Sequence, residues 1–389
     1  MLFSKVYGQD CNCVASTTDL TVTSGQTVVV NAYYPGSTNA VTGSTSIVIG
    51  AKRTIPSPAF TDLGGTISAG DILMVVQMQG AEIDPTISDI TVTFDPGDDI
   101  YTTSDYGDGP GGLDHEGFLD NGNYIAGQYE FVMATNAIGA SGGTLTIEDP
   151  LTNSYIANTT PTATIGRRTF QVIKVGNYND LTVDAGGEIT TIPWNGTTGG
   201  IISIDALGTM NLNGVIDANF AGFRGGHLDL TGGDNSDPDN GYRGEGIAGT
   251  PQQVFGYNDD FTTISGTTGL AQGYPGGTEN IDCDITFDGN PFNDINIVWT
   301  ADRGQGAPGN AGGGGLLNNG GGGGSNGSGG GNGANEGTIS SGGGAAIDLE
   351  NGSRLVLGGG GGSGGQTDVL NDGFPEDVNS GRPGGGSVL

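Results

Sequence analysis

Residues 354–362 read RLVLGGGGG, so that a short apolar segment runs directly into five consecutive glycines. Glycine-rich sequence is by default a flexible linker, because glycine loses more conformational entropy on ordering than any other residue. Here, however, apolar segments alternate with glycine runs, whereas flexible linkers usually separate whole domains. We therefore expect ordered glycine segments that pack backbone to backbone as extended helices of the polyproline II type, here called polyglycine II-like. The runs concerned are 312–315, 320–324, 329–331, 342–344 and 358–362.

The sequence before these runs, from residue 180 to 220, contains short apolar segments separated by Gly, Asn or Asp. Short strands with tight corners and no intervening helix are typical of a solenoid such as a parallel β-helix. An ordinary β-sandwich is the alternative for this stretch. The candidate strands are 181–183, 188–190, 200–204, 209–212 and 214–217.

Residues 71–79, DILMVVQMQ, form the strongest strand signal of the N-terminal part. A continuous apolar run between Gly70 and Gly80 predicts a strand buried on both faces. Further strands at 129–133, 144–147 and 167–175, with turn signals between them, predict an antiparallel β-sandwich or barrel.

Together these patterns predict an all-β chain, an N-terminal β-sandwich or barrel followed by a β-helix-like solenoid. We expect an N-terminal arm or leader remnant over residues 1–18, the sandwich or barrel over 19–175 and the glycine-rich solenoid over 176–389. The last residues, 384–389, enter an apolar strand directly after a turn, which favours a C-terminally truncated solenoid.

The charge balance limits the partners of the chain. Its 389 residues include 43 Asp and Glu but only 11 Lys and Arg, which gives a formal net charge of −32. Nucleic acids and anionic membrane surfaces require a basic patch, and this composition supplies none. No apolar stretch is long enough to span a bilayer. The charge favours solubility in a salty exterior, or divalent cations as counter-ions.

One acidic cluster has the spacing of a calcium-binding loop. Asp234, Asp237 and Asp239 precede Gly241, and Glu245 lies close by. Carboxylates supply the hard oxygen ligands that calcium prefers, and glycine permits the turn. The alternative is a solvated acidic surface, which chance clustering would produce in a chain this acidic.

The cysteines offer one candidate cross-link. Cys11 and Cys13 are too close in sequence for an unstrained disulfide, so that one of them, Cys11 for example, could pair with Cys283. A zinc site is less consistent with the sequence, because no second close cysteine pair and no neighbouring histidines accompany the first pair.

Arginines adjoin glycines or turns at several positions. Because a guanidinium offers five donors in a rigid fork, we expect several of these residues to hold carbonyl-rich or acidic loops together as buried structural groups. They are Arg167, Arg168, Arg224, Arg243 and Arg303.

No catalytic motif is present. The sequence contains no nucleophile elbow, no zinc-protease motif and no phosphate-binding loop, and the two histidines stand apart. We therefore expect a protein without catalytic activity. A carbohydrate-binding module and a β-helix polysaccharide lyase or hydrolase are the alternatives. Aromatic residues that could stack on sugars if exposed are Trp194, Trp299, Tyr33, Tyr34 and Tyr242.

An ordered series of glycine-containing motifs resembles the glycine-rich N-terminal module of very large secreted surface proteins of Bacteroidetes. The resemblance implies export by the type 9 system, a place at the cell surface, and a structural or adhesive role. Other protein subunits, a second copy of the chain or surface glycans would be its partners. The matching stretches are 69–79, 166–173, 193–200, 222–226, 244–251 and 303–315.

Overall fold

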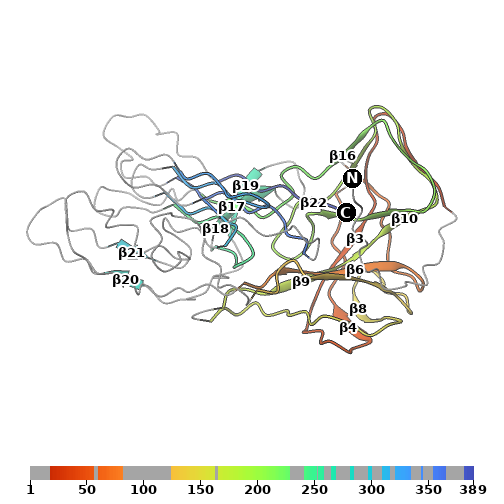
Figure 1. The fold of residues 1–389 in the computed structure, drawn as a ribbon, viewed down its shortest axis with the longest axis horizontal. Helices are drawn as coiled ribbons and strands as arrows, with labels where there is room; N and C mark the ends of the chain where they lie inside the picture. The colour runs from red at the N-terminus through yellow and green to blue at the C-terminus, as the bar shows by residue number, and fades with distance from the viewer. Residues whose placement is uncertain are drawn as a thin grey trace, which may run out of the picture.

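The computed structural model is all-β, with no helix in the residues that it describes (Figure 1). Those residues are 18–56, 60–81, 124–162, 165–227, 241–251, 253–257, 264–268, 281–283, 297–299, 309–315, 320–333, 343–344, 354–364 and 381–389. The strands up to residue 175 are β1 (Leu20–Val22), β2 (Thr27–Val29), β3 (Ala32–Pro35), β4 (Ser46–Ile49), β5 (Thr61–Asp62), β6 (Ile72–Gln79), β7 (Tyr129–Met133), β8 (Gly143–Thr146) and β9 (Thr169–Lys174).

The later strands are shorter and begin directly after β9. They are β10 (Gly176–Tyr178), β11 (Leu181–Val183), β12 (Glu188–Thr190), β13 (Ile201–Ile202), β14 (Ile204–Ala206), β15 (Met210–Leu212), β16 (Val215–Asp217), β17 (Gly225–Gly226), β18 (Gln253–Tyr257), β19 (Ile264–Thr268), β20 (Ile281–Cys283), β21 (Ile297–Trp299) and β22 (Ser387–Val388).

A four-stranded antiparallel sheet, in the order β3-β9-β6-β7, organises the strand-rich end of the molecule. All eight residues of β6 are buried, which confirms the prediction of a strand covered on both faces. Leu73 and Val75 pack into a core shared with the two-stranded sheet β4-β8, while Met74 and Val76 face a different core on the other side. Alternate residues of one strand thus supply two cores.

A stack of short parallel strands lies beside this sheet. We call its layers rung 1 (residues 18–30), rung 2 (176–192) and rung 3 (201–218). β1 pairs with β11 and β11 with β15, while β2 pairs with β12 and β12 with β16, all in parallel and in register. Equivalent residues therefore form columns, such as Leu20, Leu181 and Met210.

The stack joins parts of the chain that are far apart in sequence. Rung 1 belongs to the expected N-terminal domain and rung 2 to the expected solenoid, yet their strands share two sheets. The expected boundary between residues 175 and 176 is therefore crossed by hydrogen-bonded strands. None of the sheets described here closes on itself.

The glycine-rich segments form a bundle of extended chains, and residues 358–363 lie at its centre. We call this set the glycine bundle (residues 222–226, 241–245, 309–315, 320–325, 329–333, 343–344, 358–364 and 381–386). The backbone amides of six consecutive residues of the central segment donate hydrogen bonds to the carbonyls of three neighbouring segments in turn. Gly358 and Gly361 donate to Gly385 and Arg382, respectively, of one segment. Gly359 and Gly362 donate to Ser325 and Gly322 of a second segment, and Gly360 and Ser363 donate to Glu245 and Tyr242 of a third.

The carbonyls of the central segment continue this rotation. Two further segments donate backbone hydrogen bonds to the central segment. Phe223 and Gly226 donate to the carbonyls of Gly358 and Gly361, respectively, and Gly312 and Gly315 donate to those of Gly360 and Ser363. Every neighbour thus meets the central segment at intervals of three residues. The glycine runs described here are consequently hydrogen-bonded and packed, as expected from their alternation with apolar segments. Of the two apolar segments among the runs, 354–357 is described and 345–349 lies outside the described residues.

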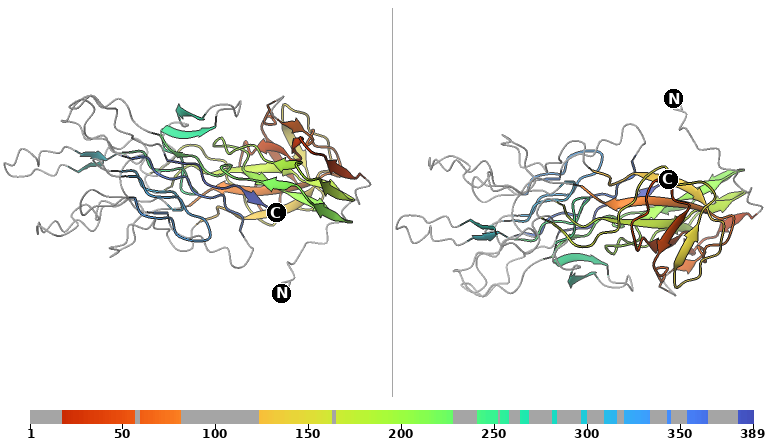
Figure 2. Two further views of the ribbon diagram at one scale, coloured as in Figure 1. Left: turned by 90° about the horizontal axis from the view of Figure 1, so that it is seen from above. Right: turned by 90° about the horizontal axis from the view of Figure 1, so that it is seen from below.

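Absence of side chains is what permits this packing. A Cβ on Gly359 would overlap the carbonyl oxygen of Asn310, and one on Gly360 would overlap that of Arg224. Any other residue would push the neighbouring chains apart. Viewed from above and below, the glycine segments run lengthwise away from the strand-rich end (Figure 2).

One hydrophobic core connects the bundle to the strands. It includes Met74 of β6, Trp194 between rungs 2 and 3, Phe223 of the bundle and Leu357, which precedes the central segment. Trp194 and Phe223 meet edge to face with their ring centroids 5.8 Å apart. The bundle is therefore packed onto the same core as the antiparallel sheet.

Candidate functional site

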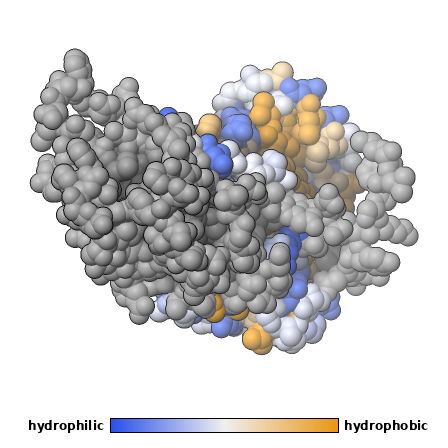
Figure 3. Space-filling model, turned by 60° about the vertical axis from the view of Figure 1, so that its left-hand side comes forward, coloured by the Kyte–Doolittle hydropathy of each residue, from blue (hydrophilic) through white to orange (hydrophobic). Residues whose placement is uncertain are grey.

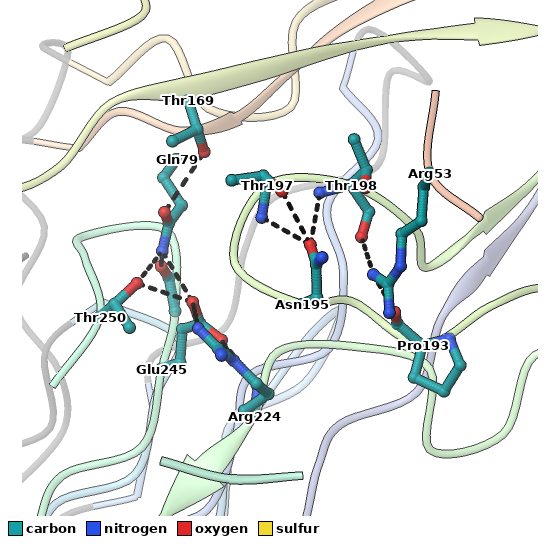
Figure 4. Close-up of polar contacts among 11 residues, drawn as sticks. Arg53, Gln79, Thr169, Pro193, Asn195, Thr197, Thr198, Arg224, Glu245 and Thr250 are labelled. Atoms are coloured by element: carbon teal, nitrogen blue, oxygen red, sulfur yellow. Dashed lines mark hydrogen bonds and ion pairs between the residues drawn. The ribbon is translucent and has the colours of Figure 1, made fainter. Parts of the chain in front are cut away.

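A buried polar cluster lies where the glycine bundle meets β6. Arg224, which precedes β17, and Glu245, between two glycines, come from two neighbouring segments of the bundle (Figure 4). The Nε of Arg224 lies 2.8 Å from Oε2 of Glu245, and the glutamate side chain is fully buried. Gly225 directly follows Arg224, and Gly244 and Gly246 flank Glu245, which leaves the backbone room to bring these two groups together.

The carboxylate of Glu245 is saturated with donors. Oε2 accepts from the backbone amide and the Nε of Arg224, at 3.1 and 2.8 Å. Oε1 accepts from Nη2 of Arg224 at 3.0 Å and from Oγ1 of Thr250 at 2.7 Å. Bidentate pairing of this kind is among the strongest polar contacts in proteins.

The environment of Glu245 favours its charged form. Burial raises the pKa of the carboxyl group, but the charge of Arg224 and the hydrogen bonds from Arg224 and Thr250 outweigh that effect and hold the pKa below its ordinary value of 4.5. A carboxylate that is saturated with donors and resists protonation is suited to fastening segments rather than to transferring protons.

Gln79 connects this cluster to the antiparallel sheet. Its Nε2 donates to the carbonyl of Gly246 at 3.0 Å and to Oγ1 of Thr250 at 3.1 Å, and its Oε1 accepts from Oγ1 of Thr169 at 3.3 Å. Gln79 ends β6 and Thr169 begins β9, so that one amide ties two strands to the loop that carries Thr250. We call Arg224, Glu245, Thr250, Gln79 and Thr169 the junction network.

The loop of residues 193–200 is held beside the junction network. Oδ1 of Asn195 accepts from the amides of Thr197 and Thr198, both at 3.0 Å, which closes a tight turn. Nη1 of Arg53 donates to the carbonyls of Pro193 and Thr198, at 3.0 and 2.9 Å. The loop is thus fixed both by its own side chain and by an arginine from the N-terminal part.

Arg167 packs against the same loop. A Cβ on Gly196 would lie 3.2 Å from Nη1 of Arg167 and 2.6 Å from Nη2 of Arg224, so that two guanidinium groups flank this glycine. Burial lowers the pKa of Arg167 to about 10; the charge of Glu245 opposes that shift and the charge of Arg224 adds to it. Nε and Nη1 of Arg167 are buried and make no hydrogen bond.

The expected structural arginines fall into three groups. Arg167, Arg224 and Arg243 are buried, and Arg224 forms the ion pair with Glu245. Arg168 lies at the bridge to Asn158, beside β9. Arg303 lies outside the described residues. Whether these side chains stabilise the protein stays a prediction.

Of the four residues that the sequence suggests as calcium ligands, one lies in the described part of the chain and three do not. Glu245 belongs to the junction network, whereas Asp234, Asp237 and Asp239 lie outside the described residues. Within the described part of the chain, no three His, Cys, Asp or Glu side chains come together in a way that could hold a metal ion. Calcium binding at the three aspartates stays a prediction that does not include Glu245 as an available ligand.

The remaining candidates lie partly outside the described residues. Cys11 is one of these, and Cys283 ends β20 opposite Ile297 of β21, so that the disulfide stays a prediction. Of the aromatic residues considered for sugar stacking, the side chain of Trp299 is not described and the other four are buried in cores: Trp194, Tyr33, Tyr34 and Tyr242.

The junction network contains residues that the sequence patterns did not single out. Gln79, Thr250 and Thr169 are fully or almost fully buried. A usable signal was present, because glutamines at positions 77 and 79 of a strand expected to be buried on both faces must find partners. What could not be read locally was the identity of those partners.

The chain matches no protein-family model, no curated protein and no solved structure. In the described residues, no helix is long and apolar enough to cross a membrane.

Proposed function

We propose that the chain is an extracellular structural or adhesive module of a large bacterial surface protein or appendage, acting without catalysis. The observation that carries this proposal is the glycine bundle. Six successive amides of its central segment are all engaged with neighbouring chains, and its apolar flank shares a core with the antiparallel sheet. Such a bundle is a stiff extension attached to a folded base, which suits a spacer or a tip better than a hinge.

We further propose that the three rungs are part of a β-helix-like solenoid and that the bundle is polyglycine II-like. Parallel in-register pairing of successive rungs supports the first interpretation. The interval of three residues between contacts supports the second, because such helices have about three residues per turn. The two cores on either side of β6 are compatible with an N-terminal sandwich of which the four-stranded sheet is one layer.

Charge and the family resemblance support the location. A net charge of −32 keeps a large exported protein soluble and discourages binding to nucleic acid. The motif series of the secreted surface proteins includes residues 193–200 and 222–226, both of which take part in the packing around the junction network. Export by the type 9 system, partner subunits and a second copy of the chain are parts of the same proposal.

The proposal is tested in the bacterium that encodes the chain. Protease added to intact cells should degrade the protein while a cytoplasmic marker survives, and deletion of its gene should reduce attachment of the cells to surfaces. Complementation with a Gly331→Ala variant, whose new methyl group meets nothing within 4 Å, should restore attachment. Complementation with Gly359→Ala, which disrupts the bundle, should not. A protein protected inside intact cells would overturn the proposal.

A further inference from the structure

The last rung of the stack exposes residues that the preceding rung buries. Leu181 and Val183 of rung 2 are 0% exposed, whereas Met210 and Leu212, in the same columns of rung 3, are 44% and 49% exposed. Side chains in these columns point into the stack, so that each is covered by its neighbours in the rungs on either side. Figure 3 shows hydrophobic side chains gathered at the upper right of the molecule.

The backbone of rung 3 is open on the same side. Alternate residues of a strand direct their peptide groups to opposite edges. The carbonyl of Thr209 and the amide of Asn213 bond to rung 2, so that the peptide groups of Met210 and Leu212 face away from it. An apolar strand edge with free peptide groups is a template for another strand.

The first part of this edge is already paired with β22. It pairs in parallel with β13, the first strand of rung 3. Leu389, directly after β22, accepts a hydrogen bond from the amide of Ile204 at 3.0 Å and donates to the carbonyl of Ile202 at 2.9 Å. The direction and the register of a fourth layer are therefore set along the first part of rung 3.

We propose that the edge formed by β14, β15 and β16, here called the open rung edge, is the docking surface for a fourth rung. The fourth rung is a segment of short strands that runs parallel to rung 3 in the direction of β22. Its chemistry follows from the columns: apolar residues opposite Met210 and Leu212, with Gly or Asn at the corners. A second copy of the chain at this edge is the other possible occupant, and sedimentation of the original chain tests for it.

The fourth rung can be supplied by adding a copy of residues 204–218 directly after Leu389. This joint preserves the register, because Ser387 and Val388 already lie opposite Ile201 and Ile202. The added rung should raise the Tm by about 2 °C or more. It should also slow the oxidation of Met210 by hydrogen peroxide, measured by peptide mapping. An added segment of the same composition in scrambled order is the control and should do neither.

A paired substitution separates docking from a general effect of the added segment. Met210→Asp with Leu212→Asp should abolish the gain in Tm in the extended chain but change the Tm little in the original chain, where both side chains are exposed. Equal Tm values and equal Met210 oxidation rates for the copied and scrambled segments would overturn the proposal. So would self-association of the original chain, in sedimentation, that the two aspartates abolish. Neither outcome depends on where the cell places the protein.

Discussion

At the scale of single residues, the buried ion pair between Arg224 and Glu245 has a large electrostatic consequence. Both side chains are buried at the junction of the bundle and β6, with the carboxylate completely shielded from solvent. Taking two charges out of water is costly, and their mutual pairing, together with the hydrogen bonds that the carboxylate accepts from Thr250 and the Arg224 amide, offsets that cost. Removing one partner therefore leaves an uncompensated charge in the interior.

Glu245→Gln should destabilise the protein by about 3–5 kcal/mol, because Arg224 then stays buried without a counter-charge. Denaturant titration followed by circular dichroism measures the change. Glu148→Gln, at an exposed position, is the matched control and should stay within about 0.5 kcal/mol of the original chain. Equal effects of the two substitutions would show that the junction ion pair contributes no more than a surface charge.

The same pair predicts a pH dependence. The pKa of Glu245 is lower in the folded than in the unfolded chain, so that its stabilising contribution is present above about 4.5 and is lost as the pH falls through the folded value. The difference in unfolding free energy between the original chain and Glu245→Gln should therefore shrink below that pH. The other carboxylates titrate in both proteins, so that their contribution to the unfolding free energy cancels in this difference. A difference that stays constant down to pH 3 would contradict this explanation.

At the scale of elements, the glycine bundle depends on close backbone approach. Gly359 has no room for a Cβ, because the carbonyl of Asn310 occupies that position, whereas Gly331 has open space there. Both residues lie in the bundle, so that the comparison isolates packing from the loss of chain flexibility that any Gly→Ala change brings.

Gly359→Ala should lower the unfolding free energy by about 3 kcal/mol or more, since the neighbouring chain must move. Gly331→Ala should change it by about 0.5 kcal/mol or less. Thermal and denaturant unfolding of the two variants provide the measurement. If Gly331→Ala proved as damaging as Gly359→Ala, close packing would not be the property that the central segment requires.

Amide exchange gives an independent test of the bundle. The amides of residues 358–363 all donate hydrogen bonds to other segments, so that they should exchange with deuterium as slowly as those of β6. A flexible glycine linker would lose its protons uniformly and fast. Mass spectrometry of peptides that cover this segment distinguishes the two cases.

At the scale of the whole molecule, one core connects segments that the sequence separates. Met74, Trp194, Phe223 and Leu357 belong to the same buried cluster, although they come from the antiparallel sheet, the loop between rungs 2 and 3, the bundle and the residue before its central segment. Shared burial of this kind couples the parts energetically, because exposing one removes apolar contacts from the others.

The described parts should consequently unfold together. In a Trp299→Phe background, the fluorescence of Trp194 reports the junction and circular dichroism reports the sheets. Their transitions in denaturant should coincide, and protection of the amides of 358–363 should be lost at the same denaturant concentration. Loss of glycine protection at a clearly lower concentration would show that the bundle is an independent appendage.

Much of the local structure follows from the sequence. Strands over 71–79, 129–133 and 181–183 lie where periodicity and glycine corners predict them. It was also predictable that the glycine runs are ordered and not flexible linkers, because apolar segments interrupt them. These features depend on neighbouring residues, whose spacing determines which face of an element is apolar.

Only the tertiary structure decided which segments meet. The pairing of β1 with β11 joins Leu20 to Leu181 across most of the N-terminal part, and no local pattern specifies that choice. Glu245, close in sequence to three aspartates, pairs instead with Arg224 from another segment. The local sequence pattern determines which face of each element is apolar and must be buried. The identity of the neighbour depends on three-dimensional packing and charge pairing between residues far apart in sequence.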